Sequence, residues 1–116
     1  HWCYVIIVSY VYIKQLGCTK LSKFIIHNAS YIDDRALKGL SYGRDTITYL
    51  QVSKCVNVTD AGVKELEVLD KLENLLLFHL ESVEHLEECK LSLQQHLPKC
   101  KILGAKGVSE VNDNKQ

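Results

Sequence analysis

Two histidine–cysteine pairs have the spacing of metal ligands. His85 and Cys89 lie four positions apart, as do His96 and Cys100. Residues at this spacing share one face of a helix, and four nitrogen and sulfur ligands would suit tetrahedral zinc. However, Pro98 would separate the second pair from a helix, and the repeat described below puts Cys100 in a strand position that faces the core. The sequence therefore predicts neither a metal site nor another bound cofactor.

Catalytic chemistry has no better support in the sequence. The five cysteines are scattered without a C-x-x-C pair, which favours buried thiols in a reducing compartment over a disulfide framework. Cys55 and Cys100 occupy expected core positions, where burial raises the pKa of a thiol and makes it unreactive. No pattern marks a base beside an activated nucleophile, and the six glycines form no phosphate-binding loop. We expect a protein that is not an enzyme.

Composition narrows the class of partner. Apolar residues make up 47% of the chain and charged residues 24%, so a core can form, and 116 residues predict one globular domain. Lysine plus arginine number 14, aspartate plus glutamate number 14, and neither sign forms a long run. Nucleic-acid binding needs a clustered basic surface, and docking to anionic lipid needs a basic segment. We therefore expect protein partners and no nucleic acid.

A sequence repeat organises the elements that position these side chains. The stretch "LSKFIIHNASYIDDRALKGL" (21–40) matches "ITYLQVSKCVNVTDAGVKEL" (47–66) at a constant shift of 26 residues, so that Phe24 corresponds to Leu50. A third copy begins at "LENLLLFHLESV", where Leu75 corresponds to Leu50. A truncated fourth copy, "LPKCKIL", places Leu97, Cys100 and Ile102 in the positions of Leu72, Leu75 and Leu77. A period in the mid-twenties with L-x-x-L-x-L spacing is typical of leucine-rich repeats.

The repeat predicts an α/β fold, namely a leucine-rich-repeat solenoid of three to four repeats, with short parallel strands and helices on the convex side. Inward strand residues such as Leu50 and Val52 would stack into a continuous core. Thr59 or Asp60 would cap the following helix through a side-chain oxygen, and Gly62 would lie where neighbouring coils crowd together. After the third strand, residues 82–97 would form an amphipathic helix that ends at proline.

The repeat also divides the chain into ranges. The leucine-rich-repeat domain should span residues 16–104, and the tail 105–116 should be disordered because it loses the period. Residues 1–15 contain an apolar run that is too short to cross a bilayer. Its β-branched residues favour a buried strand or a degenerate repeat, with the end of a membrane helix as the alternative. The chain begins at His1 and lacks methionine, so we expect a fragment or a processed form.

Strand residues that alternate with the inward positions define the expected partner-binding face. In repeat proteins of this kind the outward positions line a concave sheet, which is the usual place for a bound protein. The six candidates are Ile25, His27, Gln51, Ser53, Leu76 and Phe78. Large apolar groups among them stand where solvent is expected, which indicates a protein interface. The alternative is that flanking segments of the same chain cover this face.

The repeats resemble a known mitochondrial family. The stretches "YIDDRALKGL", "LQVSKCVNVTDAGVKELEVLDKLENLLLFHLESV" and "LPKCKILG" are similar to ATP synthase subunit s and its relative, the distal membrane-arm assembly component 2 (ATP synthase subunit s-like). The similarity covers roughly residues 16–104. The closing L-P-x-C-x-[IV]-x-G pattern favours the assembly component, whereas C-x-x-[IV]-T-D-x-G-[ILV] also occurs in the repeats of F-box substrate receptors.

This resemblance implies a non-catalytic scaffold at the matrix side of the mitochondrial inner membrane, peripheral to the membrane at most. The assembly-component branch implies partners among the assembly intermediates of the distal membrane arm of respiratory complex I. The subunit s branch implies a coupling factor associated with ATP synthase. In subunit s a segment ahead of the repeats is linked to a divalent ion, but that segment has no counterpart here. A substrate receptor of a ubiquitin ligase is the further alternative, and it requires an F-box upstream.

Overall fold

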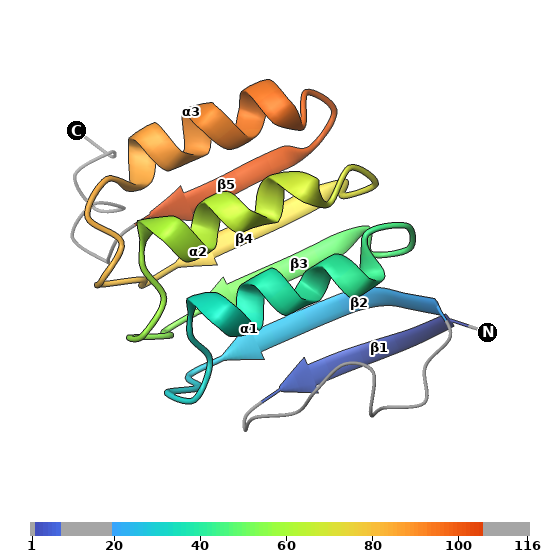
Figure 1. Ribbon diagram of the computed structural model, residues 1–116, viewed down its shortest axis with the longest axis horizontal. Helices are drawn as coiled ribbons and strands as arrows, with labels where there is room; N and C mark the ends of the chain where they lie inside the picture. Colours follow the sequence, from blue (N-terminus) through green and yellow to red (C-terminus); the bar gives the residue numbers. More distant parts are fainter. Residues whose placement is uncertain (1, 8–19, 106–116) are drawn as a thin grey trace.

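The computed structural model describes residues 2–7 and 20–105, in which strands alternate with short helical segments (Figure 1). The elements in chain order are β1 (Trp2–Ile7), β2 (Lys20–His27), α1 (Asp34–Lys38), η2 (Gly39–Gly43), β3 (Tyr49–Ser53), α2 (Asp60–Lys64), η3 (Glu65–Val68), β4 (Asn74–Phe78), α3 (Leu86–His96) and β5 (Lys101–Ala105). Here η marks a 3-10 helix. From β2 onward, each helical segment connects one strand to the next.

The strands form a single parallel sheet in the order β1–β2–β3–β4–β5. Consecutive parallel strands require a crossover connection, and α1, α2 and α3 supply the crossovers from β2 to β5. The three helices lie side by side over one face of the sheet (Figure 1). We call the opposite face, on which none of the described helices lies, the uncovered face. The predicted α/β class with short parallel strands is confirmed.

Matching residues of the sequence repeat lie side by side in neighbouring strands. Phe24 pairs with Leu50, and Leu50 pairs with Leu75, as the repeat predicts. The next inward residues, Ile26, Val52 and Leu77, pair in the same way. All six are buried, and the helices close the core from the other side with Leu37, Leu40, Val63, Leu66, Leu86, Cys89 and Leu93. Burial of such side chains from water is the main stabilising term of the fold.

The chain turns in the same way after each of three strands. Asn28, Lys54 and His79 follow β2, β3 and β4, and their φ angles are 54°, 55° and 55°. This left-handed conformation is costly for residues other than glycine. The backbone N–H of each of these residues donates to a carbonyl at the end of the next strand, at 2.9, 3.1 and 3.1 Å respectively. The shared turn therefore joins neighbouring strands as well as reversing the chain.

The fourth copy of the repeat is out of the predicted register. Leu75 pairs with Ile102, and Leu77 pairs with Gly104, so Cys100 does not take the position of Leu75. Cys100 is still buried, but it precedes β5. The spacing between paired positions is longest here, because Ile102 follows Leu75 by 27 residues (102 − 75), whereas Leu75 follows Leu50 by 25 (75 − 50). Leu97 is the C-cap of α3, and the strand begins later than the L-x-x-L-x-L spacing suggests.

Side chains of α3 bind the backbone of the last strand. Lys90 Nζ donates to the carbonyl of Gly104 at 3.0 Å, and Gln94 Nε2 donates to the carbonyl of Cys100 at 3.0 Å. The carbonyl of Ala105 accepts from the N–H of His79, the residue that follows β4. Because successive carbonyls of a strand point to opposite sides, the Gly104 carbonyl points away from β4. Lys90 therefore occupies an acceptor on the outer edge of β5, and Gln94 occupies the acceptor of the residue just before this strand.

The predicted ranges at the two ends of the chain lie largely outside the described residues. Within the range 1–15, residues 2–7 form strand β1, in which Val5 pairs with Phe24 of β2. This segment of residues 2–7 is a strand of the sheet, so the alternative of a membrane-helix end is wrong for it. The rest of that range and residues 106–116 lie outside the described residues. Ala105 belongs to β5 rather than to the tail. No helix in the described part of the chain has the length and apolar character needed to cross a membrane.

Candidate functional site

The predicted partner-binding residues lie on the uncovered face in a regular grid. Because side chains alternate along a strand, the residues between the buried positions point away from the helices. Ile25, Gln51 and Leu76 are neighbours in one row across β2, β3 and β4, and Leu103 of β5 extends this row. His27, Ser53, Phe78 and Ala105 form the next row towards the strand ends. The structure thus brings all six predicted residues together.

Ser53 differs from the prediction because it is not available to a partner. Its side chain is buried, with 4% exposed, whereas His27 beside it is exposed. His27 Nδ1 and Ser53 Oγ lie 2.8 Å apart in a hydrogen bond. In the register, Ser53 stands between His27 and Phe78, and these larger neighbours cover it. The alternation of side chains along one strand takes no account of the size of neighbours on the adjacent strands, so the prediction was wrong for Ser53.

Five further residues of this face were missed. Leu103 is 45% exposed beside Leu76, which makes it the most exposed large apolar residue among the strand side chains that the structure describes. The row nearest the strand starts contains Lys23, Tyr49, Asn74 and Lys101. Lys23 Nζ lies 4.6 Å from the centre of the Tyr49 ring, which is the geometry of a cation–π contact. Extending the alternation to both ends of each strand would have found these residues.

The Thr59–Asp60 loop has a different role from the helix capping that was predicted. Thr59 is the N-cap of α2, yet its side chain makes no capping hydrogen bond. Thr59 instead donates through its backbone N–H and its hydroxyl to the Asp34 carboxylate, at 2.8 and 2.5 Å. Asp33 is the residue that caps α1, because it accepts from the N–H of Ala36 at 3.0 Å. Asp34 therefore joins two strand–helix units, and we call this contact the first junction.

Gly62 belongs to the first junction as well. A Cβ atom at Gly62 would lie 2.2 Å from Asp34 Oδ1 and 3.0 Å from Asp34 Cα. Neither distance leaves room for a methyl group, so the predicted crowding at Gly62 is confirmed. The crowding partner is the aspartate that receives Thr59. The sequence signal for this contact was the glycine itself, three residues after threonine.

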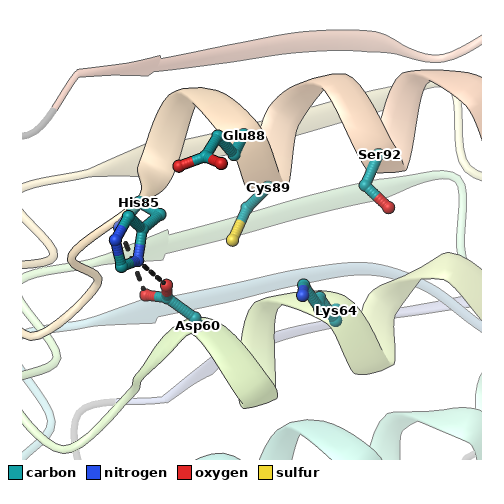
Figure 2. A pocket seen from close by; sticks show the side chains of 6 residues that line it. All are labelled: Asp60, Lys64, His85, Glu88, Cys89 and Ser92. Atoms are coloured by element: carbon teal, nitrogen blue, oxygen red, sulfur yellow. Dashed lines mark hydrogen bonds and ion pairs between the residues drawn. The ribbon is translucent and has the colours of Figure 1, made fainter.

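Asp60 makes the corresponding contact with the next unit, which we call the second junction. Its carboxylate accepts from the N–H of Glu84 at 2.8 Å and lies 2.9 Å from His85 Nδ1. Figure 2 shows these two side chains facing each other between α2 and the start of α3. By the repeat, His85 stands where the earlier units have Asp34 and Asp60. A histidine thus replaces the aspartate in the third unit.

The second junction changes the acid–base behaviour of both groups. Burial alone would raise the pKa of Asp60, but hydrogen bonds from the His85 side chain and from the N–H groups of Glu84 and His85 lower it overall. The hydrogen bond to Asp60 raises the pKa of His85, and the charges of Asp60, Glu88 and Glu84 add to this increase. Both shifts favour the ion pair of an aspartate anion and a protonated histidine.

A shallow polar groove of about 260 Å³ surrounds this pair. Its lining is Asp60, Lys64, His85, Glu88, Cys89 and Ser92 (Figure 2). His85 precedes α3 as its N-cap and points at Asp60, while Cys89 is buried against the core. Among the described residues, no three histidine, cysteine, aspartate or glutamate side chains come together in a way that could hold a metal ion. The groove does not assemble the zinc ligands considered from the sequence.

Three cysteines whose side chains the structure describes are placed for packing. Cys55, Cys89 and Cys100 are free thiols with at most 4% of each residue exposed. Burial raises the pKa of all three, and it raises the pKa of Cys100 to about 11. A thiol with a raised pKa carries little of the reactive thiolate at neutral pH. The predicted inert character of Cys55 and Cys100 agrees with this burial.

Comparison with known proteins adds no relative. No protein-family model matches the chain, and no curated protein matches it at a significant level. The site is therefore defined by its geometry alone: an uncovered sheet face with apolar and basic side chains, and two polar junctions that hold the units together.

Proposed function

We propose that this chain is a non-catalytic protein-interaction scaffold of the leucine-rich-repeat type, with the uncovered face as its binding surface. The observation that carries the proposal is the constant register, in which Phe24, Leu50, Leu75 and Ile102 are neighbours in successive parallel strands. A sheet built this way presents its outward side chains in straight rows. Such a surface suits recognition of another protein better than chemistry on a small substrate.

The junctions support a structural role for the polar residues. Asp34, Thr59 and Asp60 are engaged with neighbouring units, and the thiols of Cys55, Cys89 and Cys100 are buried. The residues whose types could carry out catalysis or metal binding are thereby engaged in contacts between units or buried in the core. On the uncovered face, Ile25, Leu76 and Leu103 are the apolar residues offered to a partner, in a row that also contains Gln51, and we call this row the apolar row.

The cellular role that we propose follows from the resemblance of the repeats. We infer an assembly factor for the distal membrane arm of respiratory complex I, acting at the matrix side of the mitochondrial inner membrane. The closing pattern "LPKCKILG" supports this branch of the family. A coupling factor of ATP synthase is the alternative within the same family, and a substrate receptor of the F-box type is the alternative outside it.

Purification of a tagged full-length protein from solubilised mitochondria tests this role. We expect complex I assembly intermediates in the wild-type sample and their loss with Leu103→Glu, which charges the uncovered face. Tyr31→Glu is the matched control, because Tyr31 is 63% exposed in a loop outside the sheet. Recovery of ATP synthase would select the coupling-factor alternative. Recovery of neither complex would refute the proposed role, and an F-box in the full-length transcript would do the same.

A further inference from the structure

Charge is distributed unevenly between the sheet and the rest of the molecule. The chain has 14 acidic and 14 basic residues, yet none of the acidic residues lies in a described strand. The charged residues of the strands are lysines, namely Lys20, Lys23 and Lys101. The acidic residues are found in helical segments, in loops and near the carboxyl-terminal end of the sequence. The zero net charge of the whole molecule therefore conceals a sheet whose formal charges are all positive.

Two of these lysines occupy the uncovered face beside its apolar row. Lys23 and Lys101 belong to the row that starts the strands, and Leu76 and Leu103 belong to the next row. Neighbouring rows are two residues, or about 7 Å, apart, and the three strand spacings from β2 to β5 span about 14 Å. Lys101 is exposed and forms no ion pair with any residue that the structure describes.

We propose that the uncovered face binds an acidic amphipathic segment of another protein. Apolar side chains of the segment would pack on Leu76, Phe78 and Leu103, and carboxylates along one side of it would face Lys23 and Lys101. If the segment is a helix that crosses the strands, the 14 Å span corresponds to carboxylates two to three turns apart. This inference rests on the proposed function, because it names the chemistry of the partner for the same face.

Other anionic partners fit this surface less well. Binding to nucleic acid draws most of its strength from many phosphate contacts. Among the side chains that the structure describes, this face presents two lysines, Lys23 and Lys101. Attraction to an anionic membrane likewise grows with each added basic residue near the surface. An apolar row bordered by a few charges is the usual composition of a protein interface, with an apolar centre and a polar rim.

Selection from a random peptide library tests the inference. The full chain would be immobilised, bound peptides sequenced, and the enriched peptides synthesised for affinity measurement by fluorescence anisotropy. We expect peptides rich in aspartate, glutamate and large apolar residues. Lys101→Glu should weaken their binding roughly three- to tenfold. Lys99→Glu, a charge reversal at an exposed position just before β5, should change affinity less than about twofold.

The outcomes separate this inference from the proposed function. Enriched peptides without acidic residues that lose binding in Leu103→Glu would overturn the inference and leave the binding face intact. Peptides that are insensitive to both Leu103→Glu and Lys101→Glu, or a failure to enrich any peptide, would overturn both. Vesicles with phosphatidylserine and a single-stranded RNA serve as additional probes. If either binds with a dependence on Lys101 and acidic peptides do not, the inference is wrong. Circular dichroism and thermal melting verify that each variant is folded.

Discussion

The two junctions join neighbouring strand–helix units through different side chains. At both, an aspartate at the start of a helix accepts hydrogen bonds from the loop of the following unit. At the first junction the donors are the N–H and hydroxyl of Thr59, and Gly62 leaves room for the carboxylate. At the second junction the donors are the N–H of Glu84 and the imidazole of His85.

This difference separates a junction governed by packing from one governed by charge. Gly62 is buried under the Asp34 carboxylate, so the first junction depends on the absence of a side chain. In the repeat, the position that corresponds to Gly62 in the third unit is Glu87, which is exposed. The second junction therefore tolerates a large side chain there and relies on a partly exposed pair instead. We expect the first to be sensitive to volume and the second to pH.

The largest expected effect is that of Gly62→Ala. The new methyl group would collide with Asp34, so the free energy of unfolding should fall by about 1–3 kcal/mol. Denaturation in urea measures this change. Gly39→Ala is the matched control, because a Cβ at Gly39 meets nothing within 4 Å and its φ of −64° suits alanine. That control should be neutral or stabilise by less than about 1 kcal/mol. Equal losses in the two variants would contradict the crowding at the first junction.

Asp34→Ala should have a smaller effect. It removes the acceptor of the two Thr59 hydrogen bonds at an exposed position, which should cost about 0.5–1.5 kcal/mol. It also removes the oxygen nearest to a Cβ at Gly62. The double variant Asp34→Ala with Gly62→Ala should therefore be less destabilised than the sum of the single variants. A strictly additive result would show that the two residues are not coupled.

The smallest effect is expected at the second junction, and it should depend on pH. The raised pKa of His85 means that its contribution is present at low pH and is lost as pH rises through that pKa. The lowered pKa of Asp60 means that its contribution is lost as pH falls through that value. The ion pair should thus stabilise most between the two pKa values.

Thermal melting of the wild type and His85→Gln across this pH range measures the effect. The difference in Tm between the two proteins should be greatest in slightly acidic solution and should shrink towards alkaline pH. Asp60→Asn should remove the same dependence. A Tm difference that does not vary with pH would show that His85 acts only through its packing and its backbone N–H.

The sequence was sufficient to predict the rows of the sheet and insufficient for the contacts between units. Strand pairing of Phe24, Leu50 and Leu75 follows from the period of apolar residues, because register is specified wherever one face is buried. From the sequence alone, by contrast, an aspartate before a helix is predicted to cap that same helix. Asp33 does cap its helix, but Asp34 and Asp60 reach the next unit. Sequence spacing within one helix carries no signal for that choice.

The remaining misses have related physical causes. The register of β5 could not be obtained from L-x-x-L-x-L spacing because Leu97 fits the template while serving as the C-cap of the longer α3. Ser53 fits the outward alternation, but its cover comes from His27 on a different strand. Leu103 and Lys101 could have been predicted by extending the alternation along that strand from the inward Ile102. Where the local sequence pattern is ambiguous, contacts with residues distant in the sequence determine the register or the exposure of a side chain.

The outer edge of β5 has a consequence for how the protein behaves in concentrated solution. An exposed edge strand is a template on which strands of other molecules can add, and such addition leads to aggregation. Here Lys90 and Gln94 already donate to the carbonyls of Gly104 and Cys100. A strand from another copy would have to displace a positively charged amine and an amide before it could pair. At these two positions the edge is accordingly protected against the addition of another strand.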